Sequence, residues 1–146
     1  MYTGLLHAHS GLRWILLVLI VWAIIKSVSG WMGQKDYQKS DRIAALLALI
    51  FTHIQLLIGL VLYFQSPKVS FESGVMESSL LRFYTIEHIT MMIVAIALIT
   101  FGFSSAKRLE ASLAKHKRVA ITYGIGLLIM IASIPWPFRG LGAGWF

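Results

Sequence analysis

Four long apolar runs constrain the fold of this chain more than any other feature. They cover about Leu12 to Val28, Ile43 to Phe64, Phe83 to Phe103 and Val119 to Trp136. Each run approaches the roughly 20 residues that an α-helix needs to cross about 30 Å of hydrocarbon. Strands are disfavoured, because the runs are continuously apolar rather than alternating. We therefore predict an all-α integral membrane protein, an up-down four-helix bundle with helices at about 4–30, 42–64, 80–105 and 118–135.

The composition agrees with a membrane protein and leaves no room for a separate soluble domain. Of the 146 residues, 58% are hydrophobic and 13% are charged. In an average soluble domain about a quarter are charged. We expect a single four-helix domain, residues 1–146. The first run lacks a basic segment before it and a small-residue cleavage pattern after it, which disfavours a removable signal peptide.

The basic residues lie at the ends of the apolar runs and not on a soluble face. Nine of the thirteen flank two connections, and they are Lys26, Lys35, Lys39, Arg42, Lys107, Arg108, Lys115, Lys117 and Arg118. The positive-inside rule then predicts that both connections are cytoplasmic and both termini outside, as in a multi-pass protein of the bacterial inner membrane. The net charge of +7 thus reflects orientation and attraction to anionic lipid. The lipid bilayer is the expected partner, and nucleic acid is not.

Ionisable side chains enter two of the predicted spans near the same membrane face. They are Arg82, Glu87 and His88 in the third span and His7, His9 and Arg13 in the first. Such groups are costly in hydrocarbon, so they are functional-site candidates by default. Their convergence predicts a metal or cofactor site in the outer half of the bundle. Because the chain contains no cysteine, thiolate metal sites and covalent c-type haem attachment are excluded.

Three histidines are predicted to reach a common depth. At about 1.5 Å per residue, His9 lies about 9 Å, His88 about 12 Å and His53 about 16 Å from the outer ends of their helices. Bis-imidazole ligation of haem needs two histidines on facing helices at similar depth. The preferred pair is His9 with His88. His53 with His88 is the second choice, and His7 is a further alternate.

The neighbouring charged groups could serve the same cofactor or be purely structural. Arg13 and Arg82 suit the forked recognition of haem propionates. Glu87 could accept the N–H of a ligating imidazole, or form an ion pair with Arg13. His53 could equally be satisfied by a hydrogen bond across helices. His116, which lies among lysines in the third connection, is expected to be a solvated loop residue.

Three motifs stand out at the predicted outer face. They are His7-x-His9-Ser10-Gly11-Leu12-Arg13-Trp14, Arg82-Phe83-x-x-x-Glu87-His88 and Ser133-Ile134-Pro135-Trp136-Pro137-Phe138-Arg139. These motifs resemble those of small bacterial four-helix membrane proteins labelled cytochrome b or cytochrome b-like, and the likeness extends over essentially the whole length. The resemblance implies a b-type haem ligated by His9 and His88. His53 has no clear place in the pattern.

Two functions of different class are compatible with these features. The first is electron transfer by a haem b that exchanges electrons with quinone and quinol or works within a respiratory complex. One haem near one face cannot carry electrons across about 30 Å, so other membrane subunits are expected as partners. The alternative is a cofactor-free accessory subunit of a larger membrane complex. A stand-alone enzyme has less support, because no nucleophile, acid–base pair or nucleotide loop is visible, and no catalytic residue is assigned.

Overall fold

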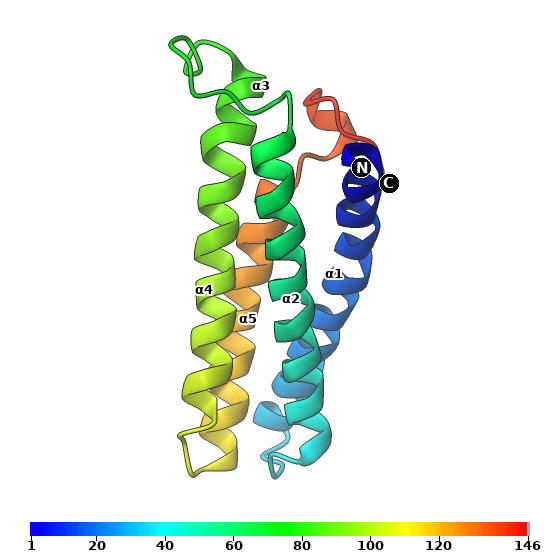
Figure 1. The fold of residues 1–146 in the computed structure, drawn as a ribbon. Coiled ribbons are helices and arrows are strands. Elements are labelled where there is room, and N and C mark those ends of the chain that lie inside the picture. The colour runs from blue at the N-terminus through cyan, green and yellow to red at the C-terminus, as the bar shows by residue number, and fades with distance from the viewer. Residues whose placement is uncertain (146) are drawn as a thin grey trace.

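The computed structural model describes residues 1–145 and is built from four long helices that lie side by side (Figure 1). They are α1 (Tyr2–Met32), α2 (Lys39–Gln65), α4 (His88–Ala106) and α5 (Ser112–Ser133). The short helix α3 (Ser79–Arg82) and a π-helical turn (Phe83–Glu87) lead directly into α4, and a 3-10 turn (Pro137–Arg139) follows α5. The prediction of an all-α fold is confirmed for the described residues.

Three helical segments are long and apolar enough to cross a membrane: Tyr2–Met32, Lys39–Gln65 and Ser79–Ala106. Their outward faces carry large apolar side chains in the open, such as Val18 at 69% exposure and Leu57 at 64%. Soluble proteins rarely expose wide apolar surfaces of this kind. Contact with lipid hydrocarbon explains them, and the chain is a membrane protein.

The helices pack in the order α2, α1, α5, α4. The pairs α4–α5, α1–α2 and α1–α5 make extensive contacts, whereas α2 and α4 touch each other sparsely. Ile20, Ile99 and Val119 are fully buried in the shared core. Small residues let neighbouring backbones approach closely, because a Cβ at Gly102 of α4 would collide with Thr122 of α5.

The two ends of the bundle differ in character. One end holds the start of α1, the segment 66–87 and residues 134–145, and we call it the histidine end (Figure 1). The opposite end holds the connections 33–38 and 107–111 with the helix termini beside them, and we call it the basic end. Each end forms its own pocket, as described below.

The helix α5 begins at Ser112, earlier than the predicted start near residue 118. His116 is therefore a helical residue and not a loop residue. Its side chain is buried at 1% exposure against Gly30 of α1, and its ring centroid lies 4.9 Å from that of Tyr37. The expectation of a solvated histidine is wrong, because the basic residues around it continue the helix while this one ring turns toward α1.

Candidate cofactor site

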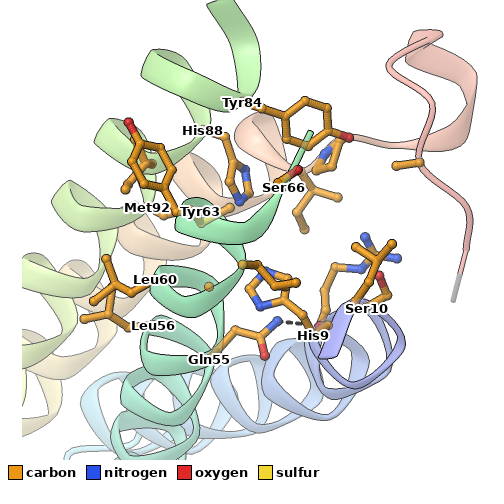
Figure 2. A pocket seen from close by; sticks show the side chains of 18 of the residues that line it. His9, Ser10, Gln55, Leu56, Leu60, Tyr63, Ser66, Tyr84, His88 and Met92 are labelled. Atoms are coloured by element: carbon orange, nitrogen blue, oxygen red, sulfur yellow. Dashed lines mark hydrogen bonds between the residues drawn. The ribbon is translucent and has the colours of Figure 1, made fainter. Parts of the chain in front are cut away.

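A cavity of about 200 Å³ lies within the histidine end of the bundle. Its walls come from all four long helices, the loop after α2, the π-helical turn and the segment after α5. Much of the lining is apolar, including Leu56 and Leu60 of α2 and Met92 of α4 (Figure 2). His9 and His88 enter it from two different helices. A mostly apolar space with a few convergent polar groups is the usual form of a small-molecule or cofactor site.

His88 is the first residue of α4 and is oriented by the end of α5. Its Nδ1 lies 2.8 Å from the carbonyl oxygen of Ser133. That carbonyl has no helical partner because α5 ends at Ser133, and the residue before Pro135 leaves the helical conformation. A carbonyl only accepts, so Nδ1–H donates and Nε2 of the neutral ring is the free acceptor on the cavity side (Figure 2). A backbone bond of this kind is what orients metal-ligating imidazoles.

The π-helical turn Phe83–Glu87 sets the direction in which His88 faces. Such a turn contains one extra residue, which rotates the following side chains by about 100° relative to an uninterrupted α-helix. Two contacts fix the turn at Thr85: the Tyr63 hydroxyl donates to its carbonyl oxygen at 2.9 Å, and the Ser70 amide donates to its hydroxyl at 3.1 Å. The turn is therefore held by α2 and the loop that follows it, and π-helical turns are frequent at functional sites.

His9 lies on α1 and is held against α2. The Gln55 side-chain amide donates to the carbonyl oxygen of His9 at 2.6 Å, which ties the two helices together at this level (Figure 2). The imidazole passes so close to Gly59 that a Cβ there would lie 3.1 Å from its Cε1. Any larger residue at this position would crowd the ring.

Five buried side-chain nitrogen and oxygen atoms lack a hydrogen-bond partner within residues 1–145. Three of them belong to residues that line the cavity: His9 Nδ1, Arg13 Nε and Gln55 Oε1. The other two are the ring nitrogens of His116. Native proteins leave few such atoms unpaired, and each asks for an explanation. Three around one cavity indicate a polar surface that a bound molecule would complete.

Arg13 lies one helical turn along α1 from His9 and is buried at 8% exposure. Its guanidinium donates to the carbonyl oxygen of Trp145 at 2.9 Å. It also lies 5.3 Å from the ring centroid of Trp14 and 5.7 Å from that of Trp136. No carboxylate in residues 1–145 pairs with it. A buried cation is costly unless an anion pairs with it, and since residues 1–145 supply none, an anionic partner is favoured at this side of the cavity.

Residues 140–145 form a strap that closes part of the cavity. Its backbone carbonyls accept hydrogen bonds from four side chains: Tyr84 to Leu141, Lys68 to Gly142, and both Arg13 and Trp14 to Trp145. Gly142 has a positive φ of 65°, which its missing side chain permits. The strap is thus tied to three separate parts of the chain through neutral backbone acceptors.

Arg82 and Glu87 do not line the cavity. They form an ion pair with each other, 2.8 Å from Arg82 Nε to Glu87 Oε1, in which both side chains are well exposed. The two residues are five apart, which is the spacing that hydrogen bonds in a π-helical turn connect. The expected contacts of Glu87 with Arg13 or with an imidazole N–H are therefore not formed, and the N–H of His88 is taken by Ser133.

The alternate histidines also lie outside the cavity. His7 is exposed, because two residues along a helix place it about 200° away from His9. His53 donates from Nδ1 to the carbonyl oxygen of Leu49 at 2.9 Å, and its Nε2 lies 3.4 Å from the hydroxyl of Thr100. The single hydrogen of the Thr100 hydroxyl goes to the carbonyl oxygen of Ile96 at 2.8 Å, so the half-buried His53 ring is held by its bond to Leu49 alone. The structure therefore brings only His9 and His88 together at the cavity.

Three residues of the site were not found from the sequence. Lys68 lines the cavity from the loop after α2, and it was visible only as a single cation in a mixed loop. Gly59 acts through the space it leaves, and Ser133 acts through its backbone carbonyl. The space at a glycine and the orientation of a backbone carbonyl cannot be recognised from the types of side chain in a sequence.

A bare metal ion has no obvious site, since the described residues contain no group of three or more His, Asp or Glu side chains that could hold one. The pair of histidines instead suits a cofactor that carries most of its own ligands. Comparison with protein-family models, curated proteins and solved structures finds no match to this chain.

Proposed function

We propose that this membrane protein binds one b-type haem between His9 and His88 and serves in electron transfer. The observation that carries the proposal is that two imidazoles, from α1 and α4, open into one largely apolar cavity. His9 has Nδ1 unpaired, and His88 has Nε2 free. Haem iron commonly takes its axial ligands from histidine. Since the porphyrin supplies the other four nitrogens, two imidazoles are sufficient.

The residues around the cavity fit a flat, mostly apolar ring system. Gly59 leaves the space that the His9 ring itself occupies, and Leu56, Leu60 and Met92 give an apolar wall that keeps water out. Sites for drug-sized ligands commonly measure about 300–1,000 Å³. Binding in a cavity of about 200 Å³ therefore has to widen it. The cavity can widen most easily by movement of the strap, or by separation of α2 and α4, which contact each other sparsely.

Two cations at the cavity, Arg13 and Lys68, suit the two propionates of a haem. In the structure both donate to neutral carbonyls of the strap, at Trp145 and Gly142. A carboxylate accepts stronger, charge-assisted hydrogen bonds than a neutral carbonyl does. Haem binding is therefore favoured when the propionates replace the strap carbonyls as acceptors for Arg13 and Lys68. Arg13 keeps the role predicted from the sequence, and Lys68 replaces Arg82 in this proposal.

Haem b, when bound, supplies reversible one-electron exchange between ferric and ferrous iron. The protein's part is to hold the ring and set its surroundings. The bond from His88 Nδ1–H to the Ser133 carbonyl raises the basicity of the imidazole and keeps its orientation. Because the site lies at one end of the bundle, the electron partner is quinol or another membrane subunit on that side, and no electron crosses about 30 Å of hydrocarbon within this chain alone.

The proposal includes an orientation in a bacterial inner membrane. With the basic end in the cytoplasm, the positive-inside rule places the histidine end and both termini outside. The helix α5 then serves as a fourth span beside the three apolar ones. Lys115, Lys117 and Arg118 in its first two turns would reach the headgroup region, as long basic side chains do near helix ends.

An absorption spectrum of the purified full chain, with haem supplied, tests the proposal. A haem band that shifts on reduction is expected for the unaltered protein and is expected to be lost in His9→Ala and in His88→Ala. The matched control is His7→Ala, which removes an exposed imidazole two residues from His9. His53→Ala is a second control. Both controls should keep the band, and circular dichroism establishes that each variant is folded.

The outcomes separate the two candidate functions. If the unaltered protein shows no haem band after gentle purification with haem, the haem proposal fails and a cofactor-free accessory bundle becomes the better description. If the band persists in both His9→Ala and His88→Ala but disappears in His53→Ala, the cofactor stands and the ligand assignment fails.

A further inference from the structure

A second pocket, of about 330 Å³, lies at the basic end between the start of α2 and the end of α4. Four cationic side chains line it: Lys39 and Arg42 from α2, Lys107 from the residue after α4, and Lys115 from α5. The described lining contains no carboxylate. The volume falls within the range of about 300–1,000 Å³ that is usual for ligand sites.

The nearby acidic residues do not neutralise this charge. Asp41 pairs with Lys26, 3.1 Å from its Oδ1 to Nζ, and its Oδ2 accepts the backbone amide of Gln38 at 2.9 Å. Asp36 and Glu110, in the two connections, form no ion pair within residues 1–145. Like charges gathered at one site repel each other unless an opposite charge joins them. The basic pocket therefore lacks its counter-charge.

The floor of the basic pocket is apolar, and the Tyr37 hydroxyl beside it is a neutral hydrogen-bond donor. Phe103 is buried at 7% exposure, and the Lys107 ammonium lies 5.7 Å from its ring centroid. Tyr37 stands beside it, 5.9 Å from the Lys115 ammonium to its ring centroid. Burial, together with the carboxylate of Asp41, raises the pKa of Tyr37 to about 12. Its hydroxyl thus stays protonated at physiological pH and can donate.

We propose that the basic pocket binds a phosphate group, and that anionic phospholipid in the surrounding membrane is its main source. Four cations and a phenolic donor match the charge and acceptor oxygens of a phosphate. The pocket stands where spanning helices end, which is the level of lipid headgroups. Basic pockets between membrane helices bind anionic headgroups in this way. The apolar floor and the sparse contact between α2 and α4 leave a place for the attached acyl chain.

The test is a titration of thermal stability with the full chain in an uncharged detergent. Phosphatidylglycerol is added in one series, phosphatidylcholine in a second and inorganic phosphate in a third. A saturable rise of the melting temperature with phosphatidylglycerol, and none with phosphatidylcholine, is the expected result. The haem proposal plays no part in this site, so the titration is run without haem.

A pair of double variants of equal charge locates the binding. Arg42→Gln with Lys107→Gln removes two cations from the pocket. It should weaken the apparent affinity about 25-fold, because each basic residue beside anionic lipid contributes about fivefold. Lys35→Gln with Arg108→Gln removes one lysine and one arginine that are exposed and outside the lining. This control should change the affinity by no more than about twofold, because solvent and salt screen such charges.

Each outcome decides the proposal. If inorganic phosphate alone reproduces the shift and the pocket variant abolishes it, the phosphate site stands and its ligand is free phosphate. If both double variants weaken the lipid effect equally, the attraction is general surface charge and the proposal is wrong. It is also wrong if phosphatidylcholine acts like phosphatidylglycerol, or if none of the three additions changes the melting temperature.

Discussion

Two histidines at opposite ends of the bundle meet different surroundings: His116 is enclosed at 1% exposure, whereas His88 is half-buried beside a cavity. His88 donates from one nitrogen to Ser133 and has a cavity beside the other. His116 pairs neither nitrogen, and a Cβ at Gly30 would lie only 2.2 Å from its ring. An imidazole that is oriented and has open space beside it can take a ligand, whereas an enclosed one only packs. An unpaired buried nitrogen therefore indicates a site only where there is room next to it.

The largest expected effect is at the basic end, for Gly30→Ala. The new Cβ would come within 2.5 Å of three atoms of the His116 ring, so this buried ring, or the two helices around it, would have to move. Overpacking of this kind costs about 1–3 kcal/mol of stability. The measurement is the free energy of unfolding in mixed micelles titrated with sodium dodecyl sulfate.

Gly124→Ala is the matched control for that change. Gly124 also lies in a long helix, but a Cβ there meets nothing within 4 Å. Since alanine favours helix over glycine by up to about 1 kcal/mol, this variant should be unchanged or more stable. Equal destabilisation by both variants would show that the close contact between Gly30 and His116 does not account for the loss of stability.

The next effect compares the two rings directly through His88→Leu and His116→Leu. The first removes a hydrogen bond and leaves the Ser133 carbonyl unpaired, which should cost about 1 kcal/mol. The second removes two unpaired nitrogens and no hydrogen bond, so stability should stay the same or rise. Unfolding in the same micelles gives both numbers. A larger loss of unfolding free energy for His116→Leu than for His88→Leu would contradict this expectation.

A smaller effect on stability is expected for Gly59→Ala, at the histidine end. The new Cβ would lie 3.1 Å from His9 Cε1, so the ring has to shift by only a few tenths of an ångström. Crowding and the better helix propensity of alanine should offset each other to within about 1 kcal/mol. Haem uptake, measured by absorption, should fall because the ring no longer holds its position. Unchanged uptake would mean that the His9 ring is not placed by Gly59.

The last effect appears only at high pH and concerns Tyr37 at the basic end. Its folded-state pKa of about 12 lies above the ordinary value of 10, so folding favours the neutral phenol. The stabilisation is complete below about pH 10 and is lost as the pH rises toward 12. The difference in melting temperature between the protein and Tyr37→Phe should therefore shift in favour of the variant over this interval. A difference that stays constant from pH 9 to about 12 would contradict it.

The long elements were predictable because hydrocarbon demands unbroken apolar segments of known length. The predicted spans at 4–30 and 42–64 differ from α1 and α2 by only a few residues at each end. The start of α5 was missed because its first turns are rich in lysine and arginine, a composition that also describes a loop. From composition alone, a charged helix end cannot be distinguished from a charged loop.

Part of the site was predictable for a different reason, namely depth along the helices. Counting residues placed His9, His88 and His53 near one level; His9 and His88 line the cavity, and His53 does not. The partners of Arg82 and Glu87 were not predictable, because the π-helical turn changes which residues share a face. Backbone features, such as the carbonyl of Ser133, leave no trace in side-chain chemistry. The haem itself stays a prediction.

The sparse contact between α2 and α4 has a consequence for how a ligand would enter the cavity. Both helices line the cavity, and they hold each other less firmly than the other neighbouring pairs do. A hydrophobic ligand dissolved in the bilayer could enter laterally between the two helices, without passing through water. Its uptake would then follow how strongly it partitions into the lipid, so a dilute compound in solution could still fill the site from a concentrated reservoir around the protein.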